Sequence, residues 1–186
     1  ATIIGGLLGV FIYEYKRLAV PVMVVVNFLY TIPSISMLGL LLYVSGVGNT
    51  TAIIALVIYA LLPMVRNTFT GLNQIDQAMC EAGIALGLTR IQRLWNIEIP
   101  LAMPTIMAGI RTMLVMTIAL TGIASFIGAG GLGVAIYRGI TTNQSALTIA
   151  GSLLIALLAI TVDALFSLGE RVTRISPHMK RYTIIF

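Results

Sequence analysis

Residues 76–100 read DQAMCEAGIALGLTRIQRLWNIEIP and decide how the rest of the chain is interpreted. They form the longest soluble-looking stretch of a largely apolar sequence, and they hold half of its acidic residues. Either Asn73 or Asp76 suits the cap of a helix start, and Gly87 suits the left-handed backbone that ends a helix. The residues at helical spacing that predict this first helix are Ile75, Ala78, Ala82 and Leu86.

A second helix is predicted directly after this glycine. Thr89 and Gln92 have the spacing of a capping box, in which two side chains satisfy each other's backbone N–H groups. The helix is expected over residues 90–99 and is expected to stop at Pro100, because proline lacks the N–H that a helix interior needs. Two short helices joined by a tight turn make a rigid unit suited to docking, named here the knob (residues 76–100).

Composition places the chain in a membrane. Of its 186 residues, 59% are hydrophobic and 9% are charged, and the mean hydropathy is +1.04. A soluble domain carries about 25% charged residues, so a soluble enzyme is excluded. A single His and a single Cys exclude a disulfide framework and a cysteine/histidine metal site. The sequence has no catalytic constellation and no phosphate-binding G-x-x-x-x-G-K-[ST] loop, so no catalytic residue is predicted.

We expect an all-α integral membrane protein with about five transmembrane helices. Residues 1–13 are too short to cross a bilayer, which takes about 20 residues, and are expected to be the end of a helix whose start is missing. The second segment exceeds one crossing, so a kink or break is expected at Pro33. Gly5 and Gly9 form a G-x-x-x-G pair, which is typical of close helix packing but also arises by chance in a glycine-rich chain. The apolar segments are 1–13, 18–45, 50–70, 101–124 and 146–168.

Basic residues orient these segments and account for the net charge of +5 without nucleic acid. Loops rich in Lys and Arg stay on the cytoplasmic side, which predicts a cytoplasmic knob and a cytoplasmic tail at residues 169–181. Arg138 alone marks the opposite side, in an outer glycine-rich loop at residues 126–145 whose glycines suit a tight re-entrant turn. Residues 182–186 turn apolar again and are compatible with the start of a further segment. The basic residues assigned to the cytoplasm are Lys16, Arg17, Arg90, Arg93, Arg171, Arg174, Lys180 and Arg181.

Charged residues inside apolar segments need partners. Arg111 and Asp163 are expected at similar depth, as an ion pair that either holds the helices together or gates a pathway. Tyrosine rings are the other candidates, because their faces attract cations, although packing and membrane-interface tyrosines are commoner. The candidate path residues are Tyr30, Pro33 and Tyr59, with Tyr43 and Tyr137 as further tyrosines.

The knob resembles the cytoplasmic coupling loop of ATP-binding-cassette (ABC) importer permeases, whose pattern is E-A-A, three residues, G, nine residues, I-x-L-P. Every spacing is kept, with Gly83 in place of the third-position alanine and Ile99 in place of leucine. The resemblance implies a coupling loop at residues 73–100 that fits a cleft of a cytoplasmic ATPase and passes its closure to the membrane helices. The residues that it assigns to this loop are Glu81, Ala82, Gly83, Gly87, Ile97 and Pro100.

Nearly the whole chain resembles the osmoprotectant branch of these permeases, through YTIPSISMLGLL (30–41), AIIALVIYALLPMVRNT (52–68) and GAGGLGVAIYRGI (128–140). Tyr30 departs from the glutamine of the usual Q-T-I-P-S. The resemblance implies a single permease domain of type I importer architecture in a bacterial cell membrane, importing glycine betaine, carnitine or choline by alternating access. Another zwitterionic compound, such as a betaine-like thiol or methionine, and a channel-like protein without an ATPase are the alternatives.

The resemblance also implies partners. ATP and Mg²⁺ would be held by separate ATPase subunits, with no cofactor in this chain. A second permease copy, identical or a close paralogue, would complete the membrane part. An external substrate-binding protein, or a binding domain fused after residue 186, would select the substrate, and lipid would surround the spans.

Overall fold

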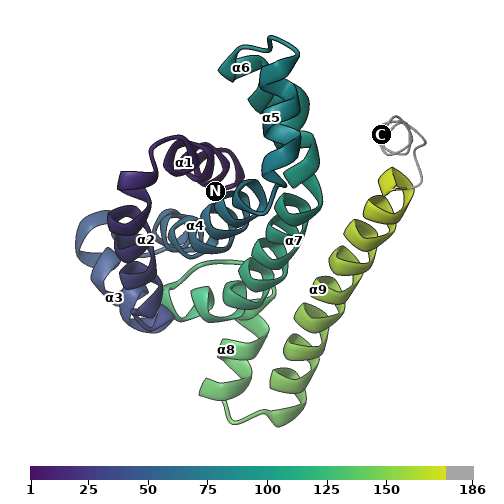
Figure 1. The fold of residues 1–186 in the computed structure, drawn as a ribbon. Coiled ribbons are helices and arrows are strands. Elements are labelled where there is room, and N and C mark those ends of the chain that lie inside the picture. The colour runs from purple at the N-terminus through teal and green to yellow at the C-terminus, as the bar shows by residue number, and fades with distance from the viewer. Residues whose placement is uncertain (175–186) are drawn as a thin grey trace.

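The described part of the chain, residues 1–174 of a computed structural model, consists of helices joined by short turns (Figure 1). The knob protrudes at one end of the molecule, and α8 with the turn into α9 lies at the other. The elements are α1 Thr2–Glu14, α2 Lys16–Thr31, α3 Ser34–Ser45, α4 Asn49–Asn73, α5 Gln77–Ala85, α6 Arg90–Arg93, the π-helix η1 Leu94–Glu98, α7 Ile99–Ala124, the 3₁₀ turn η2 Ser125–Ile127, α8 Gly133–Thr141 and α9 Ser145–Arg174.

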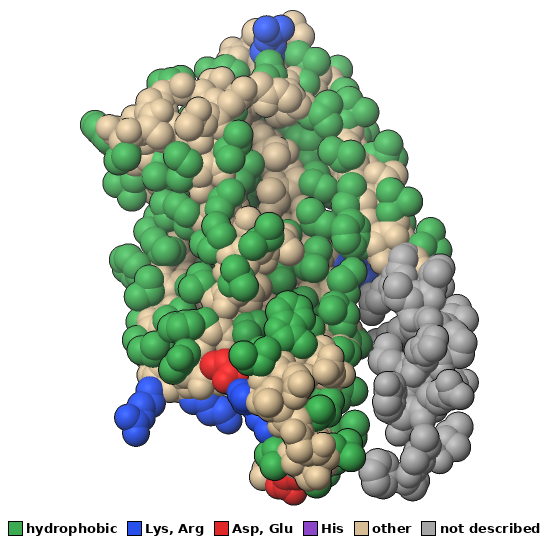
Figure 2. Space-filling model, turned by 90° about the horizontal axis from the view of Figure 1, so that it is seen from above, with side chains coloured by type: hydrophobic (Ala, Val, Ile, Leu, Met, Phe, Trp, Pro, Cys, Tyr) green, Lys and Arg blue, Asp and Glu red, His purple; other side chains and the backbone are tan. Residues whose placement is uncertain are grey.

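The described helices confirm an all-α membrane protein. Three stretches are long and apolar enough to cross a bilayer, namely Asn49–Asn73, Arg90–Ile127 and Ser145–Leu168. The bent pair α2 and α3 makes a fourth if it counts as one span, and α1 is a shorter apolar helix. Figure 2 shows hydrophobic side chains over most of one face, with most of the charged side chains in view gathered along one edge. This is the surface expected of a chain whose middle lies in lipid.

Helix α4 lies at the centre and packs closely against α1 and α7 (Figure 1). A Cβ atom added to Gly5 would lie 2.7 Å from Met64 Cβ, and one added to Gly9 would lie 2.5 Å from Thr68 Cβ. The G-x-x-x-G pair is therefore a packing surface, because only glycine leaves room for α4 at this distance.

The second apolar segment breaks at Pro33, as predicted. Helix α2 ends at Thr31, Ile32 is extended, and α3 leaves at 97° to α2. Proline disfavours a helical residue before it and lacks an N–H. Backbone carbonyl groups near it therefore need another hydrogen-bond donor. The Tyr59 hydroxyl of α4 supplies one by donating a hydrogen bond to the Ile32 carbonyl.

Residues 126–145 differ from the expected glycine-rich loop, because α8 lies within them. Gly128 and Gly131 have positive φ and form the turn, and the helix begins two residues after Gly131. Gly139 of α8 and Gly151 of α9 then lie at a close helix crossing, where added Cβ atoms would lie 2.3 Å from Thr148 Oγ1 and 2.9 Å from Ile136 Cγ1. Gly139 thus serves helix packing, while Gly128 and Gly131 form the turn.

Helix α9 continues to Arg174, so the expected tail at residues 169–181 begins as helix. The sequence places no proline between residue 146 and Pro177 to stop it earlier. The rest of that tail and the apolar residues 182–186 lie outside the described residues.

Candidate functional site

The first knob helix begins and ends as the sequence predicts. Asp76, and not Asn73, caps α5: its Oδ1 accepts a hydrogen bond from the Ala78 N–H at 2.9 Å. Asn73 instead lies in the last turn of α4. Gly87 has φ +76°, and the Leu88 N–H that follows donates to the Gly83 carbonyl at 3.1 Å. This geometry reverses the chain tightly after α5.

The capping box of the second helix is also confirmed. The Thr89 N–H donates to Gln92 Oε1 at 2.9 Å, and the Gln92 N–H donates to Thr89 Oγ1 at 3.4 Å. The predicted stop at Pro100 is wrong, since the helix runs on through η1 into α7 as one stretch, Arg90–Ile127. The physical reason is the π turn, in which the Ile99 N–H donates to the Leu94 carbonyl. This turn is wider than an ordinary α-helical turn, and the helix continues through it past Pro100, which lies at the start of α7.

Two residues of the resemblance motif meet inside the knob. A Cβ atom on Gly83 would lie 2.9 Å from Ile97 Cδ1 and 3.3 Å from Arg93 Cδ, so α5 packs directly on the helix that follows it. Ala82 is half-buried beside this contact.

Other side chains of the knob are exposed. The Glu81 side chain is exposed, and its carboxylate accepts a hydrogen bond from Gln77 at 2.9 Å. Leu86 is 79% exposed and Trp95 is 65% exposed. Exposed apolar side chains on a protruding element mark an interaction surface. The large exposed apolar residues of the knob are Ile84, Leu86, Ile91 and Trp95.

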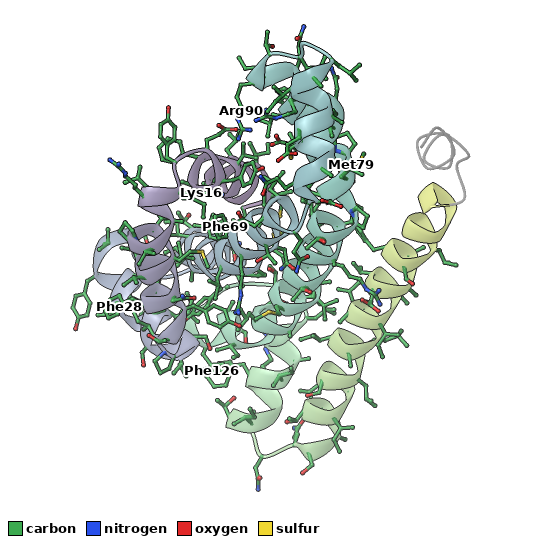
Figure 3. All side chains as sticks on the ribbon, in the orientation of Figure 1. Lys16, Phe28, Phe69, Met79, Arg90 and Phe126 are labelled. Atoms are coloured by element: carbon green, nitrogen blue, oxygen red, sulfur yellow. The ribbon has the colours of Figure 1, made fainter. Side chains whose placement is uncertain are left out.

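A buried carboxylate holds the base of the knob. Glu98 has no exposed surface, and its Oε1 accepts hydrogen bonds from Arg93 Nε at 2.7 Å and Arg90 Nη1 at 3.1 Å. Arg90 also reaches the end of α1, where Nε donates to Glu14 Oε2 at 3.0 Å and Nη2 lies 2.8 Å from Glu14 Oε1. Figure 3 labels Arg90 between the knob and α1.

Sequence reasoning missed this cluster. Glu98 occupies the unspecified position of I-x-L-P, and the arginines precede it by five and eight residues. Neither spacing matches the three- or four-residue step of an α-helical pair. The π turn and the approach of α1 create the contacts, and neither has a local signal in the sequence.

Cys80 packs beside the same carboxylate. Its Sγ lies 3.9 Å from Glu98 Oε1. Burial, and then the negative charge of Glu98, raise the pKa of the Cys80 thiol. The neutral thiol is therefore favoured at neutral pH, which agrees with the expectation of a small packed residue.

Arg111 and Asp163 lie together, in an ion pair that joins α7 to α9. Arg111 Nη2 donates to Asp163 Oδ2 at 2.6 Å, and Nε bonds to Oδ1. The two side chains are 37% and 35% exposed, beside a cavity of ≈ 370 Å³. The geometry brings the predicted partners together, and their role as a gate or as a structural link stays a prediction.

The candidate path tyrosines do not form one surface. Tyr30 and Tyr59 are neighbours, with ring centroids 5.9 Å apart, next to the Pro33 break. Tyr43 is almost fully exposed, and Tyr137 packs against Phe126 at the far end of the molecule. Tyr59 is 7% exposed within this chain, and its hydroxyl donates a hydrogen bond to the Ile32 carbonyl.

These spans and the protruding knob define the class of protein, which is a multi-pass helical membrane protein. The family described as "Binding-protein-dependent transport system inner membrane component" matches residues 1–174, and the chain belongs to this family. It is a transport component of a bacterial inner membrane.

Relatives of known function cover most of the chain. It is 44% identical over 182 residues to the glycine betaine/carnitine/choline transport system permease protein OpuCD of Bacillus subtilis, covering 97% of this chain and 79% of that protein. It is 46% identical over 168 residues to the osmoprotectant import permease protein OsmW of Salmonella typhimurium, covering 88% and 78%. It is 41% identical over 168 residues to the ergothioneine transport permease/ergothioneine binding protein EgtU of Helicobacter pylori, covering 90% of this chain and 30% of that protein.

The fold is also similar to a solved structure. The MetNI methionine ABC transporter in an inward-facing conformation matches with a TM-score of 0.81 at 22% identity, covering 92% of this chain and 86% of the other. The likeness confirms the all-helical permease fold.

Proposed function

We propose that this chain is the membrane-spanning subunit of an ATP-driven importer for a quaternary amine osmoprotectant, working by alternating access. The observation that carries the proposal is the knob. Its helices are capped and packed on each other, and it presents Glu81 with exposed apolar side chains at the end where basic residues predict the cytoplasm. A rigid surface of this kind suits a cytoplasmic ATPase.

The knob residues have different proposed roles, in docking, in the turn and in packing. Glu81 and the exposed apolar side chains would contact the ATPase, while Gly87 sets the turn, and Gly83 and Ile97 hold the two helices together. Pro100 lies where the knob joins α7, in a continuous helix from Arg90 to Ile127. Closure of ATPase subunits that hold ATP and Mg²⁺ would move the knob, and this helix would carry the motion into the membrane.

The relatives support the substrate class. OpuCD is named for glycine betaine, carnitine and choline, and OsmW for osmoprotectants. These names favour a quaternary amine for this chain. EgtU, named for ergothioneine, favours a betaine-like thiol as the second candidate.

The partners follow from the same relatives. Listeria monocytogenes has carnitine transport permease proteins OpuCD and OpuCB, at 45% and 41% identity to this chain, which favours pairing with a paralogue as much as with an identical copy. EgtU is named as both permease and binding protein, so the external binding component is proposed as either a separate or a fused protein.

The test is to purify the full-length protein gently from native membranes and to identify its partners by mass spectrometry. We expect an ATPase with the wild type and with Gln144→Lys, which also introduces a lysine but in the exposed turn at the far end. Glu81→Lys and Gly87→Pro should lose it, because the first reverses the docking charge and proline is excluded at φ +76°. A uniform oligomer without an ATPase, in wild type and variants alike, would favour the channel-like alternative.

Substrate class is tested in proteoliposomes that hold the complete complex with its binding component. We expect ATP-dependent uptake of radiolabelled glycine betaine, carnitine or choline. Uptake of ergothioneine alone would move the assignment to the second candidate.

A further inference from the structure

We propose that Arg90 links the knob to α1 through two carboxylates, Glu98 and Glu14, and that this link transmits knob movement to α1 during transport. The inference rests on the proposed function, since it assigns positioning residues to the coupling step. Glu14, Arg90 and Glu98 are positioning residues here, because they act through the helices that they join.

The covalent chain gives the knob only two connections to the membrane part. Residues 74 and 75 join it to α4, and its η1 end continues directly into α7. Helix α1 lies beside the knob but is far from it in sequence. Within the described residues, the salt bridge between the knob and α1 is made by one side chain, Arg90, and the Tyr13 side chain of α1 also lies beside Glu98.

Arg90 has the geometry of a connector. Its three nitrogens are divided between two acids: Nε and Nη2 face Glu14, and Nη1 faces Glu98. Its guanidinium carbon also lies 5.5 Å from the centroid of the Tyr13 ring, the residue before Glu14. A planar guanidinium holds such an arrangement, whereas a lysine ammonium is a single point charge.

Glu98 anchors the connector on the knob side. It is fully buried, and its Oε1 also accepts from Arg93, while Oε2 makes no hydrogen bond within the described residues. A buried carboxylate is expensive unless cations and donors compensate it. The two arginines and two glutamates of the cluster balance in charge, so displacing Arg90 from Glu98 would weaken the compensation of a buried acid.

The consequence is a rigid three-point attachment of the knob. Helix α1 packs along α4 through Gly5 and Gly9 and continues into α2, which leads to the Pro33 break. Movement of the knob therefore reaches the α2–α3 bend through α1, in addition to reaching α7 directly. Packed helices and ion pairs of this kind carry energetic coupling between distant sites.

Two variants and one control distinguish a role in coupling from a role in the stability of the fold alone. Glu14→Gln removes the acid at the α1 end and leaves Glu98 with both arginines. Arg90→Lys keeps the charge but cannot serve both acids at once. Lys16→Gln is the matched control, a neutralisation in the same turn at an exposed side chain. Glu98 itself is left unchanged, because an altered buried acid would endanger folding.

The measurement uses the complete complex in proteoliposomes with glycine betaine, and records ATP hydrolysed per substrate imported. For Glu14→Gln and Arg90→Lys we expect normal ATPase binding and hydrolysis, with uptake reduced about fivefold or more, as for a typical coupling between sites. Uptake by the double variant Glu14→Gln/Arg90→Lys should be no lower than that of either single variant, because both substitutions break the same link. Lys16→Gln should match the wild type.

Two results would overturn the inference. An unchanged ratio of ATP to substrate in Glu14→Gln and Arg90→Lys would show that α1 needs no such link. Loss of the ATPase from these variants would show that the residues only hold the docking shape of the knob. Absence of an ATPase from the wild type as well would instead contradict the proposed function, so the two failures are distinguishable.

Discussion

Single residues fix the knob through two different constraints on glycine. Gly87 needs its backbone angle, with φ +76° and open space around it. Gly83 is constrained by space instead, because the side chains of Ile97 and Arg93 lie against it. The neighbour of Gly83 is the flexible end of Ile97, which explains why the related pattern has alanine there without a different fold.

The first prediction separates these constraints. Gly87→Ala should destabilise the turn by about 1 kcal/mol, because a left-handed residue with a Cβ is strained. The Leu88 amide, which donates to the Gly83 carbonyl, should then exchange with solvent about fivefold faster. Gly87→Asn and Gly83→Ala are the controls and should exchange nearly as the wild type does. Exchange is measured by mass spectrometry. A Leu88 amide that exchanges at the wild-type rate in Gly87→Ala would contradict the strain argument.

The second prediction concerns Cys80, the single cysteine of the chain. Burial and Glu98 raise the pKa of its thiol, so the thiolate that reacts with maleimide is scarce at neutral pH. Alkylation should be slower than that of an exposed model thiol, and should rise about tenfold per pH unit between about pH 7 and pH 9. Intact-mass spectrometry gives the rates, with glutathione as the parallel standard. A plateau near neutral pH would mean a lowered pKa instead.

At the scale of elements, the features that could be predicted from the sequence are those determined by residues close together in the chain. Asp76, the Thr89–Gln92 box and Gly87 act within a few residues, and each cap forms where it was expected. The break at Pro33 is local too, but its 97° bend depends on Tyr59 from another helix. The helix through Pro100, the buried Glu98 and α8 were missed, because a π turn and packing against distant helices decide them.

The third prediction tests the bend between α2 and α3. Tyr59→Phe leaves the Ile32 carbonyl without its donor in an apolar region, which costs about 1–3 kcal/mol. The apparent Tm of the purified protein in detergent should fall. Tyr30→Phe is the matched control, because its hydroxyl donates to the Met116 sulfur at 3.8 Å, a weak acceptor. A lower Tm for Tyr30→Phe than for Tyr59→Phe would contradict the assignment of Tyr59 to the break.

At the scale of the whole molecule, α9 is held by its packing against α7 and α8. It packs against α8 through glycines at one end, and Arg111 and Asp163 join it to α7 further along. An ion pair in an apolar span is retained when it holds an assembly together or when it moves during function. The side chains are about one-third exposed, so their contribution to stability is smaller than that of a fully buried pair.

The fourth prediction distinguishes these two roles. Asp163→Ala alone should lower the apparent Tm of the assembled protein, because it removes the carboxylate to which Arg111 donates. The joint variant Arg111→Met and Asp163→Leu should recover assembly, since apolar residues replace a paired charge well. We expect uptake in proteoliposomes to return with assembly, as for a structural link. Full assembly of the joint variant without uptake, measured per assembled complex, would instead identify the pair as a gate beside the cavity between α7 and α9.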